Sequence, residues 1–209
     1  VYREKYRKHD LVFLLDNGTQ DWWQPKKHLL DIYAEKCEVS LEQRRPIIYL
    51  NDSDLEEAQN KLNELGISKN DKLLVLSPET RSKKKMKEWP YDRFLLLINK
   101  IKKNHNFKIV TMVSEDNPYD YDGTIPLKGF SLGPSAAIIK RASFYLGLDN
   151  GLTHIASCFD LKMISIHIGY PVECAGPLSP FATTVAHNPF DPPESISVEE
   201  VYETFTDLI

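Results

Sequence analysis

The residues best suited to chemistry form one short stretch, Asp149-Asn150-Gly151-Leu152-Thr153-His154. An apolar run of strand length, residues 143–148, precedes it, and residues 155–159 continue as a short helix. The stretch therefore predicts a strand-to-helix turn. In parallel α/β folds, ligands bind beyond the carboxyl ends of the strands, where such turns lie.

The residue types at this turn suit a phosphate with a sugar attached. Asn150 can cap the helix, and Gly151 has no Cβ where a ligand would approach the backbone. The first-turn N–H groups carry partial positive charge and favour an anion. Asp149 would repel a phosphate, so it is better suited to accept hydrogen bonds from ligand hydroxyls, while Thr153 and His154 could add polar contacts. Taken alone, the stretch also fits a well-capped turn with a packed histidine.

Composition and charge narrow the class of protein. The chain has 209 residues, 42% hydrophobic and 27% charged, as in soluble globular proteins. Its net charge of -4 argues against a nucleic-acid partner. Three cysteines without metal-ligand spacing predict no metal site and fit a reducing, cytoplasmic compartment. Because the sequence starts at Val1 without a methionine, we expect a piece of a longer protein.

Strands and helices alternate regularly in the larger part of the chain. The predicted strands are residues 73–76, 107–113, 125–127, 143–148, 162–168 and, more weakly, 182–186. Helices are expected between them and at 197–208, which predicts an α/β fold: a Rossmann-like parallel sheet with helices on both faces. Upstream, the patterns predict strands at 11–15 and 46–50 and helices at 28–37 and 54–65. We therefore divide the chain into 1–53, the tail of an upstream domain plus a connector, and 54–209, a nucleotide-sugar-binding domain.

The segments that follow the strands should converge at one edge of such a sheet. The segments are residues 77–87, 114–117, 128–131, 149–154 and 167–177. They supply cationic side chains, two acidic positions, a loop with accessible backbone groups and the N-terminus of a helix. Together they suit a nucleotide diphosphate sugar. Taken alone, the basic run 81–87 would usually be a solvated loop. Trp89 is expected to be a packing anchor and His167 a core or supporting residue.

Several of these motifs resemble glycosyltransferase family 9, the heptosyltransferases. Lys87-Glu88-Trp89-Pro90 resembles the family's K-x-W-P element, and residues 149–154 resemble its D-[S/T]-G-x-x-H motif. Residues 127–132 resemble the loop before the helix that leads to that motif, and residues 166–177 resemble its L-F-G-x-T…G-P segment. The resemblance covers roughly residues 70–180. One departure is Asn150, where the family usually has serine or threonine.

The resemblance implies the C-terminal half of a GT-B glycosyltransferase and assigns roles to residues. Lys87 would contact the donor phosphate or sugar, and Gly151, with Asn150 and Leu152, would bind the diphosphate through backbone amides. Asp149 and His154, with Thr153 nearby, would line the donor site. Glu115 would hold the ribose, and the Gly129–Phe130 loop would pack on the base. The family is metal-independent and uses no cofactor, and its general base would lie upstream of Val1.

The sequence therefore predicts the donor-binding portion of an inverting glycosyltransferase. The substrate would be a nucleotide diphosphate sugar, with an ADP-sugar favoured by the resemblance, and the acceptor a glycan, lipid-linked or protein molecule. The implied partners include an N-terminal GT-B domain and, through peripheral association, the inner face of the bacterial inner membrane. This piece alone would lack turnover. Two alternatives stay open: a noncatalytic nucleotide-binding or interaction module of a surface-polysaccharide protein, and another α/β enzyme with a similar turn.

Overall fold

A parallel sheet forms the centre of the molecule. The computed structural model describes residues 26–81 and 84–209. Within these ranges six strands pair in the order β3-β2-β1-β4-β5-β6, every neighbouring pair parallel. Their bounds are β1 Leu73–Ser77, β2 Lys108–Val113, β3 Ile125–Lys128, β4 Phe144–Leu148, β5 Met163–Ile166 and β6 Ala182–Val185. The order reverses direction between β1 and β4, where a ligand crevice is expected in this fold.

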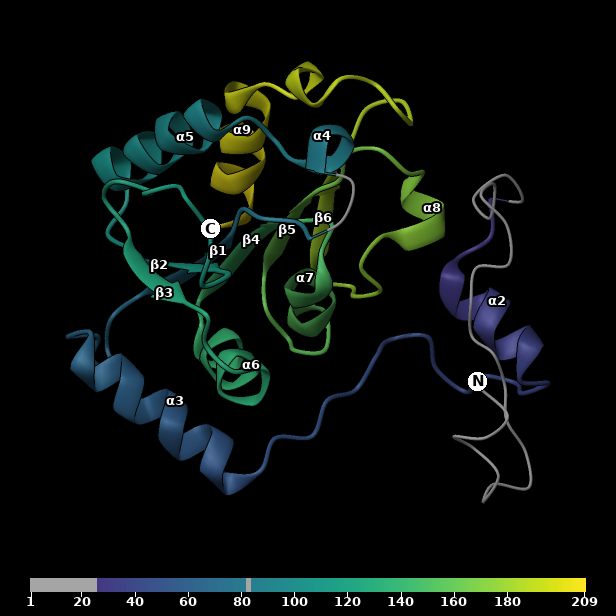
Figure 1. Ribbon diagram of the computed structural model, residues 1–209, viewed down its shortest axis with the longest axis horizontal. Helices are drawn as coiled ribbons and strands as arrows, with labels where there is room; N and C mark the ends of the chain where they lie inside the picture. The colour runs from purple at the N-terminus through teal and green to yellow at the C-terminus, as the bar shows by residue number, and fades with distance from the viewer. Residues whose placement is uncertain (1–25, 82–83) are drawn as a thin grey trace.

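Helices cover both faces of the sheet (Figure 1). On one face, α5 (Tyr91–Asn104) and α9 (Val198–Leu208) pack through apolar residues such as Phe94 and Phe205. On the other, α3 (Asp52–Glu64), α6 (Leu132–Arg141) and α7 (Gly151–Ala156) pack through residues such as Leu62 and Ile138. The predicted α/β fold with helices on both faces is confirmed.

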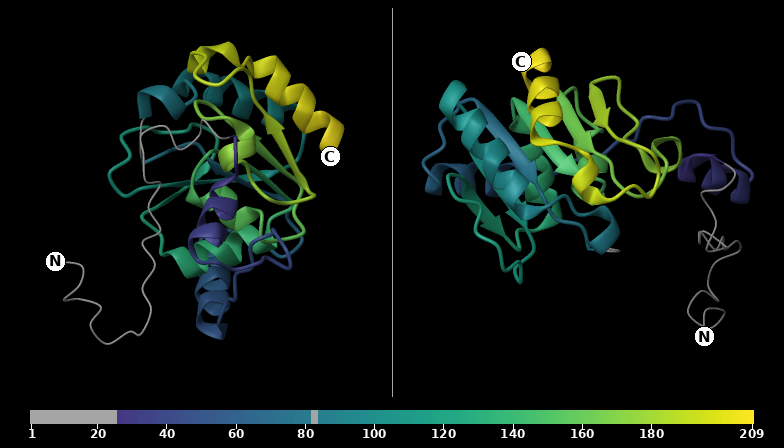
Figure 2. Two further views of the ribbon diagram at one scale, coloured as in Figure 1. Left: turned by 90° about the vertical axis from the view of Figure 1, so that its right-hand side faces the viewer. Right: turned by 90° about the horizontal axis from the view of Figure 1, so that it is seen from above.

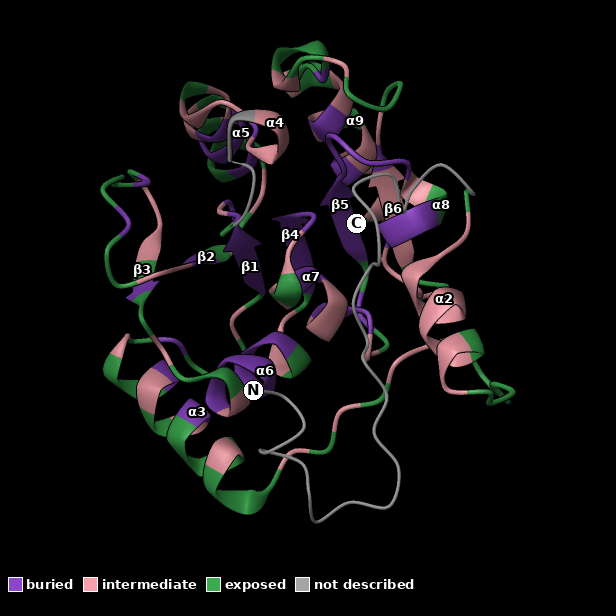
Figure 3. Ribbon diagram, turned by 45° about the vertical axis from the view of Figure 1, so that its right-hand side comes forward, coloured by how far each residue is buried: buried purple, intermediate pink, exposed green. Residues whose placement is uncertain are grey.

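The central strands are buried along their whole length, as Figure 3 shows for β1, β4 and β5. Strands covered on both faces read as continuous apolar runs rather than alternating ones. That is why 73–76 and 143–148 could be recognised from sequence. Two short helices, α4 (Lys84–Lys87) and α8 (Val172–Ala175), and a 3-10 turn at Pro193–Ser195 were not predicted.

The first described helix, α2 (Leu29–Lys36), lies beside α8, far from α3 (Figures 1 and 2). His28 caps it by accepting from the Leu30 N–H, and its Nε2 lies 3.1 Å from the carbonyl oxygen of Gly176. Leu29, the first residue of α2, and Met86 pack against the buried cluster of Tyr170, Cys174 and Ala175. This contact attaches the amino-terminal part of the described chain to the loop after β5.

The predicted strand at 46–50 is wrong. The segment is not assigned to a strand and pairs with none of the described strands. Ile47 is 60% exposed and Tyr49 89% exposed, so the apolar run lacks the neighbouring strand that a ladder requires. The predicted strand at 11–15 lies outside the described residues, and the boundary at 53 stays a prediction. No helix in the described ranges is long and apolar enough to span a membrane.

Candidate functional site

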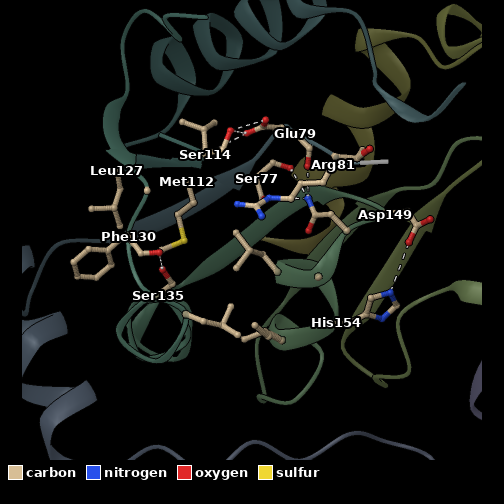
Figure 4. Close-up of a pocket in the computed structure, with 18 of the residues that line it drawn as sticks. Ser77, Glu79, Arg81, Met112, Ser114, Leu127, Phe130, Ser135, Asp149 and His154 are labelled. Atoms are coloured by element: carbon tan, nitrogen blue, oxygen red, sulfur yellow. Dashed lines mark hydrogen bonds and ion pairs between the residues drawn. The ribbon is translucent and has the colours of Figure 1, made fainter. Parts of the chain in front are cut away.

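A pocket of about 840 Å³ lies at the carboxyl edge of the sheet, at the point where the strand order reverses. Residues that end or follow four neighbouring strands, β1 to β4, line it, together with residues of α6 and α7 (Figure 4). Eight of the ten predicted site residues lie in this lining: Lys87, Gly129, Phe130, Asp149, Asn150, Gly151, Leu152 and His154. The segment 167–177 does not contribute. The convergence expected from the order of the strands is therefore present for the other four segments.

Asp149 is a buried carboxylate with the Lys87 ammonium and the His154 imidazole beside it. It is 6% exposed, forms an ion pair with the Lys87 ammonium, and lies 3.6 Å from Nε2 of His154. Burial by itself raises the pKa of Asp149. The adjacent His154 imidazole and the nearby His167 and Lys87 outweigh burial and lower this pKa to about 2. Asp149 is thus ionised throughout the physiological range and can accept hydrogen bonds from a ligand.

Asn150 fixes the turn in a way that a serine or threonine could not. Its side-chain oxygen accepts from the Thr153 N–H at 3.0 Å, which is the expected cap. Its amide nitrogen donates to the Ser77 hydroxyl at 2.9 Å and to the Glu79 carbonyl at 2.8 Å. The departure from the family pattern therefore provides two donors that tie the turn after β4 to the end of β1.

Gly151 opens the backbone to the pocket. A Cβ built on this residue meets nothing within 4 Å, and the residue is exposed and lines the pocket. A ligand atom can therefore approach the first turn of α7 closely. Thr153, by contrast, is 1% exposed and donates its hydroxyl to the Leu148 carbonyl. The structure places Thr153 beneath the pocket, where it supports the turn.

Glu115 is outside the pocket lining, whereas Glu79, which the sequence reasoning did not single out, lies within it. Glu115 is exposed, with its carboxylate folded over Gly129, a residue in the left-handed region at φ +57°. Glu79 follows β1, but its carboxylate reaches the end of β2, where Ser114 donates its N–H and its hydroxyl at 2.8 Å each. Figure 4 shows this contact above the pocket. The acid that follows β2 in the chain is thus Glu115, and the acid whose carboxylate reaches the end of β2 in space is Glu79.

The two ends of the pocket differ in chemistry. Met112, Leu127 and Phe130 gather at one end, whereas Asp149 and His154 face each other at the other (Figure 4). Arg81, an exposed cation that the sequence reasoning did not select, also lines the pocket. The pocket can therefore hold a molecule that is apolar at one end, anionic in the middle and rich in hydroxyls at the other end.

Two further expectations concern residues behind the pocket. Trp89 is 2% exposed and donates its indole N–H to the Ile196 carbonyl at 2.9 Å, so the predicted packing role is confirmed. His167 is buried just beyond the end of β5, in agreement with a core or supporting role. Among the described residues, no group of three or more His, Cys, Asp or Glu side chains is arranged to hold a metal ion.

Comparison with known proteins assigns the chain to a family. Residues 2–200 match the model of glycosyltransferase family 9 (heptosyltransferase). The chain belongs to glycosyltransferase family 9. The two motifs that resembled family 9, at Lys87 and at Asp149–His154, are the ones that the fold brings together at the pocket. No curated protein matches the chain in a sequence search.

Solved structures show the same fold at low sequence identity. The family 9 glycosyltransferase of Veillonella parvula DSM 2008 is 19% identical, with a TM-score of 0.73 over 93% of this chain and 61% of that one. The E. coli ADP-heptose LPS heptosyltransferase II is 15% identical, with a TM-score of 0.65 over 83% and 56%. The E. coli heptosyltransferase WaaC with ADP is 17% identical, with a TM-score of 0.60 over 87% and 55%. The chain thus spans between 55% and 61% of the length of these family 9 structures.

Proposed function

We propose that this chain is the donor-binding portion of an inverting, metal-independent GT-B glycosyltransferase. It would bind a nucleotide diphosphate sugar for transfer to a glycan, lipid-linked or protein acceptor. The proposal rests on one pocket, which lies where the order of the strands reverses and whose lining residues change in chemistry from one end to the other. Its chemistry changes from apolar, through cationic with open backbone, to hydroxyl-accepting.

Each part of a nucleotide sugar has a matching surface in this proposal. The base would pack on Phe130 and Leu127, and the Glu79 carboxylate would accept from ribose hydroxyls. Arg81, Lys87 and the open backbone at Gly151 would bind the diphosphate. The donor sugar would then lie near Asp149 and His154. Among the bases, adenine is favoured, because one similar structure is that of a heptosyltransferase with ADP.

The same cations would assist departure of the nucleotide. As the bond from the sugar to the diphosphate breaks, negative charge builds on the leaving phosphate. Lys87 and Arg81 would neutralise this charge in a site partly removed from water. The acceptor and the general base belong, in this proposal, to a second domain of the GT-B enzyme, so this chain alone binds donor without turnover. A lipid-linked acceptor would bring the enzyme to the inner face of the bacterial inner membrane.

Calorimetric titration of the chain with ADP, GDP, UDP and their sugars tests the proposal. The nucleotides of one base should bind with micromolar to millimolar affinity. Lys87→Gln should weaken this binding about tenfold, a loss of about 1.4 kcal/mol. Lys100→Gln is the matched control, since Lys100 forms an ion pair with Glu199 between α5 and α9, away from the pocket lining. Absence of binding by every nucleotide at millimolar concentration would refute a donor site here.

A further inference from the structure

His167 is a buried polar side chain that lacks hydrogen-bond partners. It is 2% exposed, and neither ring nitrogen has a partner among the described residues. The Ser165 hydroxyl, two residues earlier on β5, is also buried and unpartnered. Buried polar groups are nearly always hydrogen-bonded, so an unpartnered imidazole next to a candidate site calls for an explanation.

The register of the sheet places His167 beside Asp149. Leu148 and Ile166 are paired at the ends of β4 and β5, so Asp149 and His167 occupy the next positions at the same edge. Asp149 lines the pocket and His167 does not. His167 therefore lies beside Asp149 at this edge but outside the pocket lining.

Four elements contribute charged or titratable groups around the ring: Asp149 after β4, Lys87 at the end of α4, His154 in α7 and Glu173 in α8. Burial lowers the pKa of His167, while the Asp149 carboxylate acts in the opposite direction, and Lys87 and His154 add to the lowering. His167 is thus neutral at pH 7 while Lys87 neutralises Asp149.

A bound diphosphate would compete for Lys87. In the ligand-free protein the Lys87 ammonium is paired with Asp149, yet Lys87 also lines the pocket where the anion would lie. If the ammonium turns to the diphosphate, the buried Asp149 carboxylate loses its ion-pair partner. Uncompensated buried charges are strongly unfavourable, so a replacement cation is needed.

We propose that His167 is a positioning residue that takes up a proton from solvent when a diphosphate binds and replaces Lys87 as the counter-charge of Asp149. The carboxylate then keeps its place at the pocket while Lys87 engages the phosphate. The inference rests on the proposed function and adds a proton-coupled exchange of partners to it. Since a proton is taken up, affinity falls as pH rises between the pKa values of free and ligand-bound His167, by up to tenfold per pH unit.

The coupling can be tested without any ligand. In the full chain labelled with ¹⁵N and ¹³C, the ring signals of His167 report its pKa. Lys87→Met removes the competing cation, so the pKa of His167 should rise by a unit or more, whereas Lys100→Met should leave it unchanged. An unchanged His167 pKa in Lys87→Met overturns the proposal. If Lys87→Met does not fold, Lys87→Gln serves the same purpose, and the wild-type ring signals with and without ADP need no variant.

The second test counts protons on binding. ADP is titrated at pH 7 in two buffers of different ionisation enthalpy, with wild type, His167→Gln and His154→Gln compared. Any proton that ADP itself binds or releases contributes equally to all three proteins. Wild type and His154→Gln should therefore bind as much as one proton more per ADP than His167→Gln. Equal uptake by wild type and His167→Gln, or loss of uptake only in His154→Gln, overturns the proposal. If ADP does not bind, proton uptake on ADP binding is overturned together with an ADP site, while the Lys87→Met measurement still decides whether Lys87 holds down the pKa of His167.

Discussion

The Asn150 amide donates a 2.9 Å hydrogen bond to the Ser77 hydroxyl, which joins the turn after β4 to the end of β1. These two strands are neighbours in the sheet but are separated by two strands and three helices in the chain. The same amide also reaches the Glu79 carbonyl, so both sides of the pocket are held by one side chain. The position that departs from the family motif is thus the one that fixes the geometry of the crevice.

Replacing Asn150 should separate its two tasks. Asn150→Ser keeps a capping oxygen but loses both donors, so we expect the free energy of unfolding to fall by about 1 kcal/mol. Asn150→Ala removes the cap as well and should cost about a further 1 kcal/mol. Urea denaturation of the three proteins measures both steps. Equal stability of wild type and Asn150→Ser would show that the hydrogen bonds from the Asn150 amide to Ser77 and Glu79 do not contribute to the free energy of unfolding.

Gly151 should matter for binding and not for stability. A Cβ at this position meets open space and the backbone is not left-handed, so Gly151→Ala should change the free energy of unfolding by less than about 0.5 kcal/mol. It should nevertheless weaken nucleotide binding about tenfold, because the methyl group enters the pocket. Gly129→Ala is the contrasting variant: its φ of +57° and the Glu115 carboxylate above it predict a loss of about 1 kcal/mol. Unimpaired binding by Gly151→Ala would place the diphosphate elsewhere.

Glu79 and Glu115 form a matched pair for locating the ribose. Gln at position 79 can still accept from Ser114 but presents an NH₂ group to a ribose hydroxyl that needs an acceptor. We expect Glu79→Gln to weaken nucleotide binding about tenfold, or about 1.4 kcal/mol. Glu115→Gln, outside the pocket lining, should stay within about 0.5 kcal/mol of wild type. Calorimetry that gave the reverse pattern would restore Glu115 as the ribose ligand.

Because of Asp149, the free energy of unfolding should fall as the pH is lowered into the acid range. Its pKa falls from 3.8 in the unfolded chain to about 2, so its contribution is complete above pH 3.8 and is lost as pH falls toward 2. The loss should amount to about 2 kcal/mol, and it should be absent in Asp149→Asn. At pH 7, Asp149→Asn leaves the Lys87 ammonium unpaired in a site where its side chain is only 11% exposed, which should cost about 3 kcal/mol.

The double variant Lys87→Met, Asp149→Leu is the control for that measurement. Removing both charges leaves no uncompensated ion, so stability should return most of the way to wild type. Denaturation curves at pH 7 for the two single variants and the double variant give the coupling free energy. Strictly additive losses would show that the two side chains do not act as a pair.

Local patterns in the sequence were sufficient where one physical signal dominated. Continuous apolar runs predicted β1 and β4, because strands covered on both faces need no polar side. The cap at Asn150 and the anchor at Trp89 followed from the side-chain chemistry of single residues. The run at 46–50 failed for the opposite reason: a strand exists only with a partner, and an apolar run cannot show whether one is present.

By itself, the sequence determined the alternation of strands and helices, the turn at Asp149–His154 and the family to which the chain belongs, because these depend on local residue order. Only the tertiary structure decided that Glu79 rather than Glu115 lies at the pocket, and that Lys87 is paired with Asp149. It also placed His167, whose ring nitrogens have no hydrogen-bond partner among the described residues, next to Asp149 at the sheet edge. The physical reason is that strand order and the path of each loop determine which side chains meet at the edge of a parallel sheet. The spacing of residues within one segment predicts neither of them.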